Sequence, residues 1–156
     1  MSKTGVYINL DSKCAQFGFS LVHNVVKNIL GIDIGPLNLS ELGLTNEKNK
    51  LENLITKSLG VLQENGLYAF FLYLAYRQQE KGTKEIAKEI DEQAQGLLRD
   101  ENVGLLKSGS LPNGEQKYNK IRQLTEDLEK LLLARRLIEQ MLIYARYHAK
   151  ALGEKP

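Results

Sequence analysis

Tryptophan is absent from the 156-residue sequence, which has a single cysteine, Cys14, and only three prolines. One cysteine excludes an intramolecular disulfide bond and favours a reducing, cytoplasmic setting. The scarcity of proline permits long helices, because proline removes a backbone N–H and breaks a helix interior. No apolar run reaches the roughly 20 residues that a membrane-spanning helix needs. Because the N-terminal stretch includes Asp11 and lacks a continuous apolar core, we predict neither a signal peptide nor a membrane partner.

Motifs of catalytic and metal sites are also missing. The sequence contains no GxxxxGKS/T, GxGxxG, GxSxG, HExxH or ExxH pattern, and Cys14 has no second cysteine with which to hold zinc. The two histidines, His23 and His148, lie far apart, and the carboxylate pair Glu85 with Glu89 has lysine neighbours in a stretch expected to face solvent. Cys14 and His23 are predicted to be a buried thiol and a partly buried side chain. We expect a protein that is not an enzyme and that holds no metal and no cofactor.

The residues that are present favour helices. A hydrophobic content of 42% and a charged content of 26% are ordinary for a globular protein, and 156 residues suffice for one domain with a sizeable core. Apolar residues recur three and four positions apart over several long stretches, which is typical of amphipathic helices. We predict an all-α fold, a single-domain bundle of about five to six helices over residues 1–156 with a long C-terminal helix.

Helix boundaries follow from end signals. Asp11 is expected to cap the first helix and Gly31 to lie just beyond its end, because aspartate accepts from free amides and glycine takes the left-handed conformation. Asn65-Gly66 and Gly82 are expected to end two further helices. The predicted helices are Ser12–Leu30, Asn46 or Glu47 to Glu64, Leu67 to about Glu80, Lys84–Leu98 and Glu115–Leu152, with a short helical turn near Ser40–Leu44. The stripe expected on the first helix consists of Ala15, Phe19, Val22, Val25, Val26 and Ile29.

Two of these helices differ in their expected burial. Residues Leu67–Tyr76 are ten apolar or aromatic residues in a row, and a helix that is apolar all round belongs in an interior. We expect this helix to be the central, buried one. The helix Lys84–Leu98 has only a narrow apolar face, so we expect it on the outside of the bundle.

The last stretch allows more than one arrangement. A single helix over Glu115–Leu152 would be about 55 Å long, so it would bend, divide into two or pack along most of the molecule. Its apolar seam, interrupted only by Arg135, would face either a coiled-coil partner or the rest of its own bundle. Residues 1–10 are expected to be a loose lead-in, 31–45 an ordered connection over the core, and 99–114 a mobile loop.

Positive side chains gather in three groups although the formal net charge is only +2. Lysine and arginine neutralise phosphates, and interleaved tyrosines stack on bases or shield the contact, so such groups are compatible with RNA or DNA binding. The alternative is a solvated face with ion pairs to neighbours such as Glu80, Glu85 and Glu139. The groups are Arg77, Lys81, Lys84 and Lys88; Lys117, Lys120 and Arg122; and Arg135, Arg136, Arg146 and Lys150 with Tyr144, Tyr147 and His148.

Two stretches together resemble a known family. ENLITKSLGVLQENGLYAFFLYLAYRQQEKG (Glu52–Gly82) is similar to part of the small subunit of Cmr-type (type III-B) CRISPR effector complexes, where an Asn-Gly-Leu-like turn precedes an apolar helix that finishes in basic residues. LIEQMLIYARYHAKAL (Leu137–Leu152) resembles the family's closing helix, which typically carries a Trp-Leu-Lys-Arg-Phe-Ala-like run. Tyr144 stands in place of Trp, Arg146 at the following basic position and His148 in place of Phe. The matches cover roughly a third of the chain.

This resemblance implies a helical subunit without an active site of its own. Copies of such subunits stack head to tail as an inner filament beside the guide RNA and the target RNA, in contact with other effector subunits, in antiviral defence. Their basic residues would bind the phosphate backbone, while base pairing supplies sequence choice. The RNA-binding residues expected from the matching stretches are Arg77, Lys81, Arg146 and Lys150. Charge alone adds Lys107, Lys117, Lys120 and Arg122.

The alternative function is that of a helical protein–protein adaptor or regulator that does not contact nucleic acid. Such a protein would use an exposed apolar patch, which the sequence places along Leu131–Leu142. The two functions differ in an observable property. A backbone-binding subunit would bind RNA weakly and lose that binding as salt is added, whereas an adaptor would not bind RNA.

Overall fold

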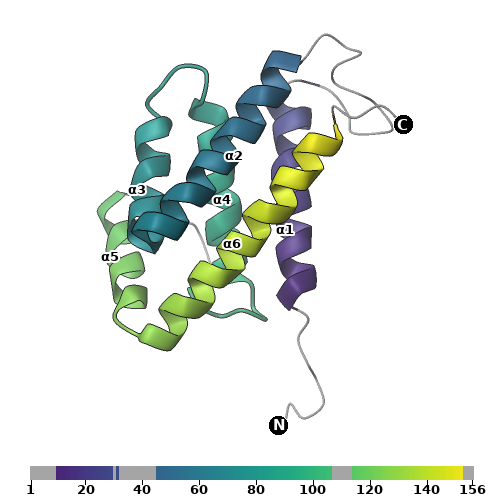
Figure 1. The fold of residues 1–156 in the computed structure, drawn as a ribbon. Coiled ribbons are helices and arrows are strands. Elements are labelled where there is room, and N and C mark those ends of the chain that lie inside the picture. Colours follow the sequence, from purple (N-terminus) through teal and green to yellow (C-terminus); the bar gives the residue numbers. More distant parts are fainter. Residues whose placement is uncertain (1–9, 30, 32–44, 107–113, 153–156) are drawn as a thin grey trace.

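The computed structural model describes residues 10–29, 31, 45–106 and 114–152 of the chain. Within these ranges it contains α-helices, one π-helical segment and no β-strand, so the predicted all-α class is confirmed (Figure 1). None of the helices found there is long and apolar enough to cross a membrane. The elements are α1 (Leu10–Asn24), the π-helical segment η1 (Val25–Ile29), α2 (Thr45–Asn65), α3 (Leu67–Arg77), α4 (Lys84–Arg99), α5 (Gly114–Thr125) and α6 (Leu128–Ala151).

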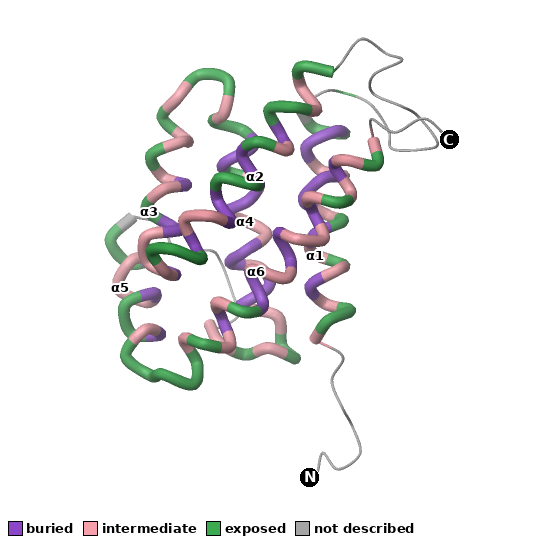
Figure 2. The backbone as a smooth tube through the Cα atoms, viewed as in Figure 1, coloured by how far each residue is buried: buried purple, intermediate pink, exposed green. Residues whose placement is uncertain are grey.

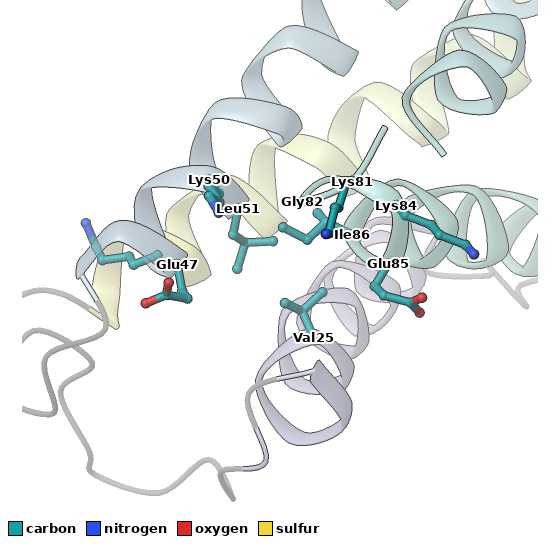
Figure 3. A pocket seen from close by; sticks show the side chains of 10 residues that line it. Val25, Glu47, Lys50, Leu51, Lys81, Gly82, Lys84, Glu85 and Ile86 are labelled. Carbon is teal, nitrogen blue, oxygen red and sulfur yellow. The ribbon is translucent and has the colours of Figure 1, made fainter. Parts of the chain in front are cut away.

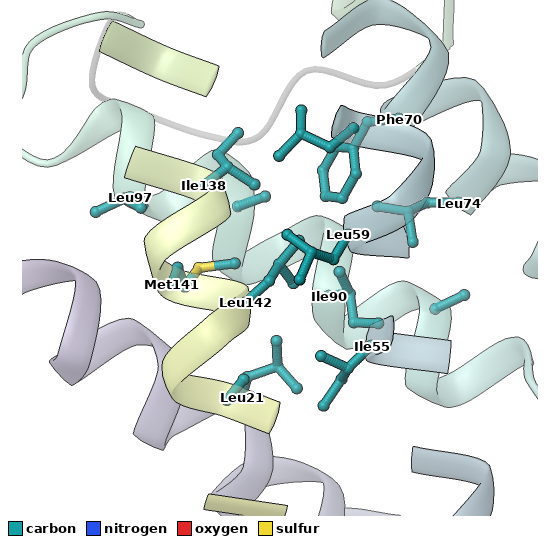
Figure 4. Packing of buried hydrophobic residues seen from close by; sticks show 14 of the residues in the cluster. Leu21, Ile55, Leu59, Phe70, Leu74, Ile90, Leu97, Ile138, Met141 and Leu142 are labelled. Atoms are coloured by element: carbon teal, nitrogen blue, oxygen red, sulfur yellow. The ribbon is translucent and has the colours of Figure 1, made fainter. Parts of the chain in front are cut away.

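Helix α6 is the one around which the others are arranged. It packs along α1 on one side and α2 on the other, and it also contacts α3, α4 and α5. α1 runs parallel to α6, whereas α2 runs antiparallel to it (Figure 1). The inner sides of these helices are buried (Figure 2) and meet in one hydrophobic core, which includes Leu21, Ile55, Phe70, Ile138 and Leu142 (Figure 4).

The backbones of α1 and α6 come into close contact at Gly18. A Cβ atom at this position would lie 2.8 Å from the Met141 carbonyl oxygen and 3.1 Å from the Ala145 nitrogen. One turn earlier in α1, the buried Cys14 thiol donates to the Leu137 carbonyl at 3.4 Å, which confirms that Cys14 is a buried thiol. Small residues on α1 therefore allow the two helices to approach each other more closely than larger side chains would permit.

Glycine marks two helix boundaries where the sequence predicted them. Gly66 between α2 and α3 has φ 95°, and Gly82 in the turn before α4 has φ 99°. Glycine adopts such left-handed angles without steric penalty, which explains why the chain can change direction there. The Gly66 amide also donates to the Leu62 carbonyl at 3.1 Å and closes the last turn of α2. The predicted third helix ends earlier than expected, at Arg77.

The first helix is rotated relative to the predicted stripe. It begins at Leu10, so Asp11 lies in its first turn and is not the N-cap. Phe19, expected in the core, is 45% exposed, whereas Cys14, Gly18 and Leu21 face inward with the predicted Val22. The predicted Val25 and Val26 are buried as expected, in η1. The reason for the rotation is the contact at Gly18: the face that lacks a side chain can approach α6, and the helix turns to present it.

Burial of the third and fourth helices differs from the prediction, although Phe70 and Phe71 of α3 are fully buried as expected. α3 lies at the edge of the bundle, where Leu72 is 46% and Tyr76 58% exposed. α4 contacts α1, α2, α3 and α6, and its buried residues include the polar Asp91 and Gln95. The narrow apolar face of α4 was misleading because these two polar side chains bond to each other inside the protein, where the Gln95 amide donates to the Asp91 carboxylate at 2.6 Å, so the buried face is wider than the apolar one.

The C-terminal stretch forms two helices. α5 ends at Thr125 and α6 begins at Leu128, with Asp127 as its N-cap: the Asp127 carboxylate accepts from the Lys130 amide at 3.3 Å. This break allows α5 to fold back against α3. The apolar seam was predicted to face either a coiled-coil partner or the rest of its own bundle. In α6 it packs into the bundle, where four of its residues are buried: Ile138, Leu142, Ala145 and Ala149.

Several predicted segments lie partly outside the described residues. These are the lead-in 1–10, of which only Leu10 is described, the connection 31–45 with its helical turn near Ser40–Leu44, and the second part of the 99–114 loop. The first part of that loop is described and folds back on α4. There, the amides of Leu105 and Leu106 donate to the Leu98 carbonyl at 3.0 and 2.9 Å.

Candidate nucleic-acid interface

The outer side of α6, between α1 and α2, carries basic and aromatic side chains. Lys150 follows Arg146 and Tyr147 by four and three positions, about one helical turn, and Arg136 lies ten positions before Arg146 on the same side of the helix. Arg136 and Tyr147 are exposed, and Arg146 and Lys150 are partly exposed at the C-terminal end of the helix. We call these four residues, Arg136, Arg146, Tyr147 and Lys150, the α6 basic face.

Lys150 has a loosely held partner. Its ammonium lies 4.0 Å from one Glu52 carboxylate oxygen, and its side chain is 45% exposed. The other Glu52 oxygen receives a closer contact from Lys48 at 2.5 Å. Because exposed ion pairs contribute only about 0–1 kcal/mol, Lys150 can exchange this contact for a phosphate at little cost.

Arg135, also on α6, is engaged within the protein. Its guanidinium donates to the Gln63 carbonyl of α2 at 2.6 Å. Gln63 lies in the last turn of α2, where carbonyl groups lack helical partners, so Arg135 satisfies a helix end. The Gln63 amide in turn donates to Glu139 at 3.1 Å. This explains why a charged residue interrupts the apolar seam of α6.

An aromatic cluster lies where α1 meets the C-terminal part of α6. The Phe19 ring stacks on His23 with a centroid separation of 5.6 Å, and His148 meets the same ring edge-on at 5.5 Å. His23 is partly buried, as the sequence predicted. Tyr144 donates its hydroxyl hydrogen to the Asp11 carboxylate, with oxygen separations of 2.7 and 2.8 Å, and this bond raises the pKa of Tyr144. Tyr144 is therefore engaged, and Tyr147 is the exposed tyrosine beside the basic residues.

Arg77 and Lys81 lie elsewhere, at the end of α3 and in the turn that follows. Arg77 is enclosed by its own neighbours: its Nε lies 2.6 Å from Glu80 Oε1, it donates to the Tyr73 hydroxyl at 2.8 Å, and it sits over the Tyr73 ring. Lys81 is exposed. In Figure 1, α2 separates this turn from α6, so these two residues do not join the α6 basic face.

Lys117 has to be removed from the predicted RNA-binding set. It is only 8% exposed, and its ammonium pairs with the buried Asp91 carboxylate of α4. It also lies over the rings of Phe71, at 5.5 Å, and Tyr118, at 5.3 Å. A phosphate would have to displace this buried ion pair, so the role of Lys117 is to attach α5 to the bundle.

The remaining predicted residues are dispersed. Lys120 lines a shallow hollow beside Leu106 and Asp127, and Arg122 is exposed with its guanidinium bonded to the Asn119 side chain. Lys107 lies outside the described residues. Of the seven candidates that the structure describes, it thus brings together only Arg146 and Lys150, and it joins them to Arg136 and Tyr147.

Sequence reasoning missed two arrangements that depend on long-range contacts. One is the Asp91–Lys117 pair, whose only sequence signal is an aspartate next to the buried Ile90. The other is a pocket that Lys50 and Lys81 line together, although 31 positions separate them in the sequence. Lys50 gives no sequence signal, because it lies on the polar side of its helix.

Comparison with known proteins gives no match: no protein-family model, curated protein or solved structure is similar enough to this chain to be identified. In the part of the chain that the structure describes, there is also no group of three or more His, Cys, Asp or Glu side chains placed to hold a metal ion.

Proposed function

We propose that this chain is a non-catalytic structural subunit of a type III-B CRISPR ribonucleoprotein effector complex and binds the guide RNA–target RNA duplex. Its copies would stack as an inner filament, in contact with other effector subunits, in the cytoplasm. The observation that carries the RNA-binding part is the α6 basic face, where Arg136, Arg146, Tyr147 and Lys150 occupy one exposed side of one rigid helix. The all-α fold and the two similar stretches support the assignment to this complex.

The α6 basic face suits the phosphate backbone of a duplex. Arginine and lysine side chains on a straight helix meet a row of phosphates without entering a groove, so they supply affinity and position but no sequence choice. Duplexes in RNA-guided complexes are held in this way, through backbone geometry, while pairing reads the sequence. Lys150 needs only to leave a 4.0 Å contact with Glu52 to take part.

Binding by the isolated protein should be weak and strongly salt-dependent. Three basic side chains would neutralise about three phosphates, and each neutralised phosphate contributes roughly −0.7 to −0.9 to the slope of log K against log salt. We therefore expect a slope between about −2 and −3. Stacked copies along one duplex would multiply these contacts, so weak binding by one copy is consistent with stable assembly.

Fluorescence anisotropy with a labelled guide–target RNA duplex tests the interface. The double variant Arg146→Glu/Lys150→Glu should bind at least tenfold more weakly at low salt and show a smaller salt slope. The control is Lys57→Glu/Lys88→Glu, which reverses two exposed lysines on α2 and α4 outside the face. An equal loss of RNA affinity in the two double variants would indicate a general charge effect. Unchanged RNA affinity in Arg146→Glu/Lys150→Glu would refute the α6 basic face.

Membership of the complex needs a separate test. The tagged chain, purified from its native host, should bring down guide RNA and other effector subunits in defined ratios. Their absence would refute the CRISPR assignment even if RNA binding by α6 were measured. RNA binding and complex membership are therefore separable outcomes.

The adaptor function is supported by one observation. Leu128 and Leu132, one turn apart at the start of α6, are 67% and 54% exposed. The patch predicted along Leu131–Leu142 is wrong in its extent, because Leu137, Ile138, Met141 and Leu142 are buried in the core. An adaptor would bind its protein partner through Leu128 and Leu132. The double variant Leu128→Ser/Leu132→Ser would then no longer bind the partner, and the unmodified protein would show no salt-dependent RNA binding.

A further inference from the structure

A pocket with an apolar floor lies between the start of α2, the turn before α4, and η1. Its volume is about 350 Å³, and Val25, Leu51 and Ile86 form its floor. These three side chains are 2%, 1% and 6% exposed, so they belong to the core and are held rigidly. Figure 3 shows them converging from three different elements below Lys50 and Lys81. A rigid apolar cavity of this size falls within the range used by small-molecule sites, roughly 300–1,000 Å³.

Two lysines, Lys50 and Lys81, line the mouth of the pocket. Lys50 Nζ lies 3.9 Å from where a Cβ on Gly82 would be, directly next to Lys81. Neither ammonium forms an ion pair with any residue that the structure describes. Both side chains are exposed at the rim of the same apolar floor, so each ammonium can contact a bound anion without first leaving another ion pair.

Other charged residues line the same pocket but do not neutralise these lysines. Lys48 is paired with Glu52, outside the pocket. Glu47 and Glu85 are on the rim, and in Figure 3 their carboxylates point to opposite sides, away from Leu51 and the floor. Lys84 adds a further positive charge at the rim.

The N-terminus of α4 adds to the positive potential. Lys84, Glu85 and Ile86, the first residues of this helix, all line the pocket. Thr83 is the N-cap residue, yet its side chain makes no capping bond and donates instead to the Arg77 carbonyl at 2.8 Å. The Lys84 amide donates to the Glu80 carbonyl at 3.0 Å, so the helix dipole is what favours a negative group at this end.

We propose that this pocket binds an amphipathic anion, a ligand with an aliphatic body and a carboxylate head. The body would cover Val25, Leu51 and Ile86, and the carboxylate would lie between Lys50, Lys81 and the first turn of α4. An inorganic anion alone would leave the apolar floor uncovered, and a neutral aliphatic ligand would leave both ammonium groups unpaired. The site is separate from the α6 basic face, so the result of a ligand-binding test does not depend on whether the protein binds RNA.

Isothermal titration calorimetry with three probes of equal chain length tests the chemistry. Decanoate, below its micelle concentration and at low salt, should bind with one site per chain. Decanol should bind at least tenfold more weakly, because it lacks the charge, and decyltrimethylammonium should not bind. Equal affinity for all three probes, or no binding of decanoate, would overturn the proposal.

Variants and methyl NMR locate the site. Lys50→Ala and Lys81→Ala should each weaken decanoate binding about tenfold, since a hydrogen bond to a charged group is lost. Lys57→Ala, an exposed lysine elsewhere on α2, is the matched control and should leave it unchanged. In the unmodified protein, decanoate should shift the methyl signals of Val25, Leu51 and Ile86 first. Shifts confined to Leu128 and Leu132 would place the ligand elsewhere and refute the site, whatever the result for RNA.

Discussion

At Gly18 a single hydrogen atom on Cα decides how closely two helices pack. A methyl group there would lie 2.8 Å from the Met141 carbonyl oxygen, which belongs to the backbone of α6 and cannot move aside alone. Gly18→Ala should therefore lower the free energy of unfolding by about 1–3 kcal/mol, despite the better helix propensity of alanine. Urea unfolding followed by circular dichroism measures this change.

Gly60 is the matched comparison, because it lies in α2 with nothing within 4 Å of its would-be Cβ. Gly60→Ala should raise the free energy of unfolding by about 0.5–1 kcal/mol, since alanine restricts the unfolded chain without a clash. Opposite signs at the two glycines are the expected result. Stabilisation at both positions would mean that α1 and α6 are not in backbone contact.

Cys14 should be unreactive in the folded protein. Burial, and secondarily the charge of Asp11, raise the pKa of the Cys14 thiol from 9.0 to about 11. Roughly one thiol in a thousand is then ionised at pH 8, and the thiolate is the reactive form. A thiol reagent should modify the native protein far more slowly than the protein in urea. Rapid modification without denaturant would show that α1 separates readily from α6.

The same thiol makes stability depend on pH in the alkaline range. Because the folded pKa is higher than the unfolded one, the folded state retains the proton between about pH 9 and 11 while the unfolded state loses it. The free energy of unfolding should therefore fall as pH rises through this window. Cys14→Ala should lack that component when its unfolding is compared with that of the unmodified protein over the same pH range.

At the scale of the elements, one buried polar network attaches α5 to the bundle. Asp91 of α4 accepts from the ammonium of Lys117, from the Gln95 amide at 2.6 Å and from the Gln78 amide at 3.2 Å. Tyr118, beside it, has its pKa raised by burial and by the charge of Asp91. The network thus involves α4, α5 and the end of α3, and it adds to the apolar packing of α5, whose Ile121 and Leu124 are buried in the core.

Removing one member of this network should be more damaging than removing the pair. Asp91→Ala leaves the Lys117 charge buried without a partner and should cost about 3–5 kcal/mol of unfolding free energy. Asp91→Leu/Lys117→Met removes both charges and should cost less than Asp91→Ala alone. Hydrogen exchange should report faster exchange over 114–125 in Asp91→Ala. An equal loss in the single and double variants would show that the ion pair does not attach α5.

Short sequence signals, such as glycine at a turn, predicted where helices end better than they predicted which side of each helix is buried. Gly66 separates α2 from α3, and Gly82 lies in the turn before α4, because their backbone angles favour glycine, and this information is contained in a few neighbouring residues. Burial of α4 depends on Lys117, which lies 26 positions from Asp91, so no local pattern could reveal it. The two-helix division at Asp127 was an open alternative, because a capping aspartate inside a helical pattern resembles an ordinary exposed one.

At the scale of the whole molecule, the protein should unfold as one unit. Buried residues from every helix that the structure describes, including Ile121 and Leu124 of α5, belong to the same core. A single core of this size favours two-state behaviour. Unfolding curves from far-ultraviolet circular dichroism, tyrosine fluorescence and Cys14 accessibility should coincide. An earlier transition by tyrosine fluorescence alone would indicate that α5, which carries Tyr118, detaches first.

The overall class and the candidate site were predictable to different degrees. Apolar periodicity suffices for an all-α bundle, because each helix shows it separately. Arg146 and Lys150 were candidates because they lie one turn apart, a relation that sequence spacing displays. Lys117 was a wrong candidate for the opposite reason: a lysine on a helix has the same spacing whether it faces solvent or Asp91, and only the packing of α5 against α4 decides between them.

The parallel pairing of α1 with α6 has a consequence for the order of synthesis. Cys14 and Leu137 are in contact although 123 positions separate them, so α1 leaves the ribosome long before its partner exists. At 5–20 residues per second the interval is roughly 6 to 25 s. During that time the face of α1 centred on Gly18 is uncovered in the nascent chain. Translation speed between α1 and α6 thus sets how long this apolar face stays uncovered.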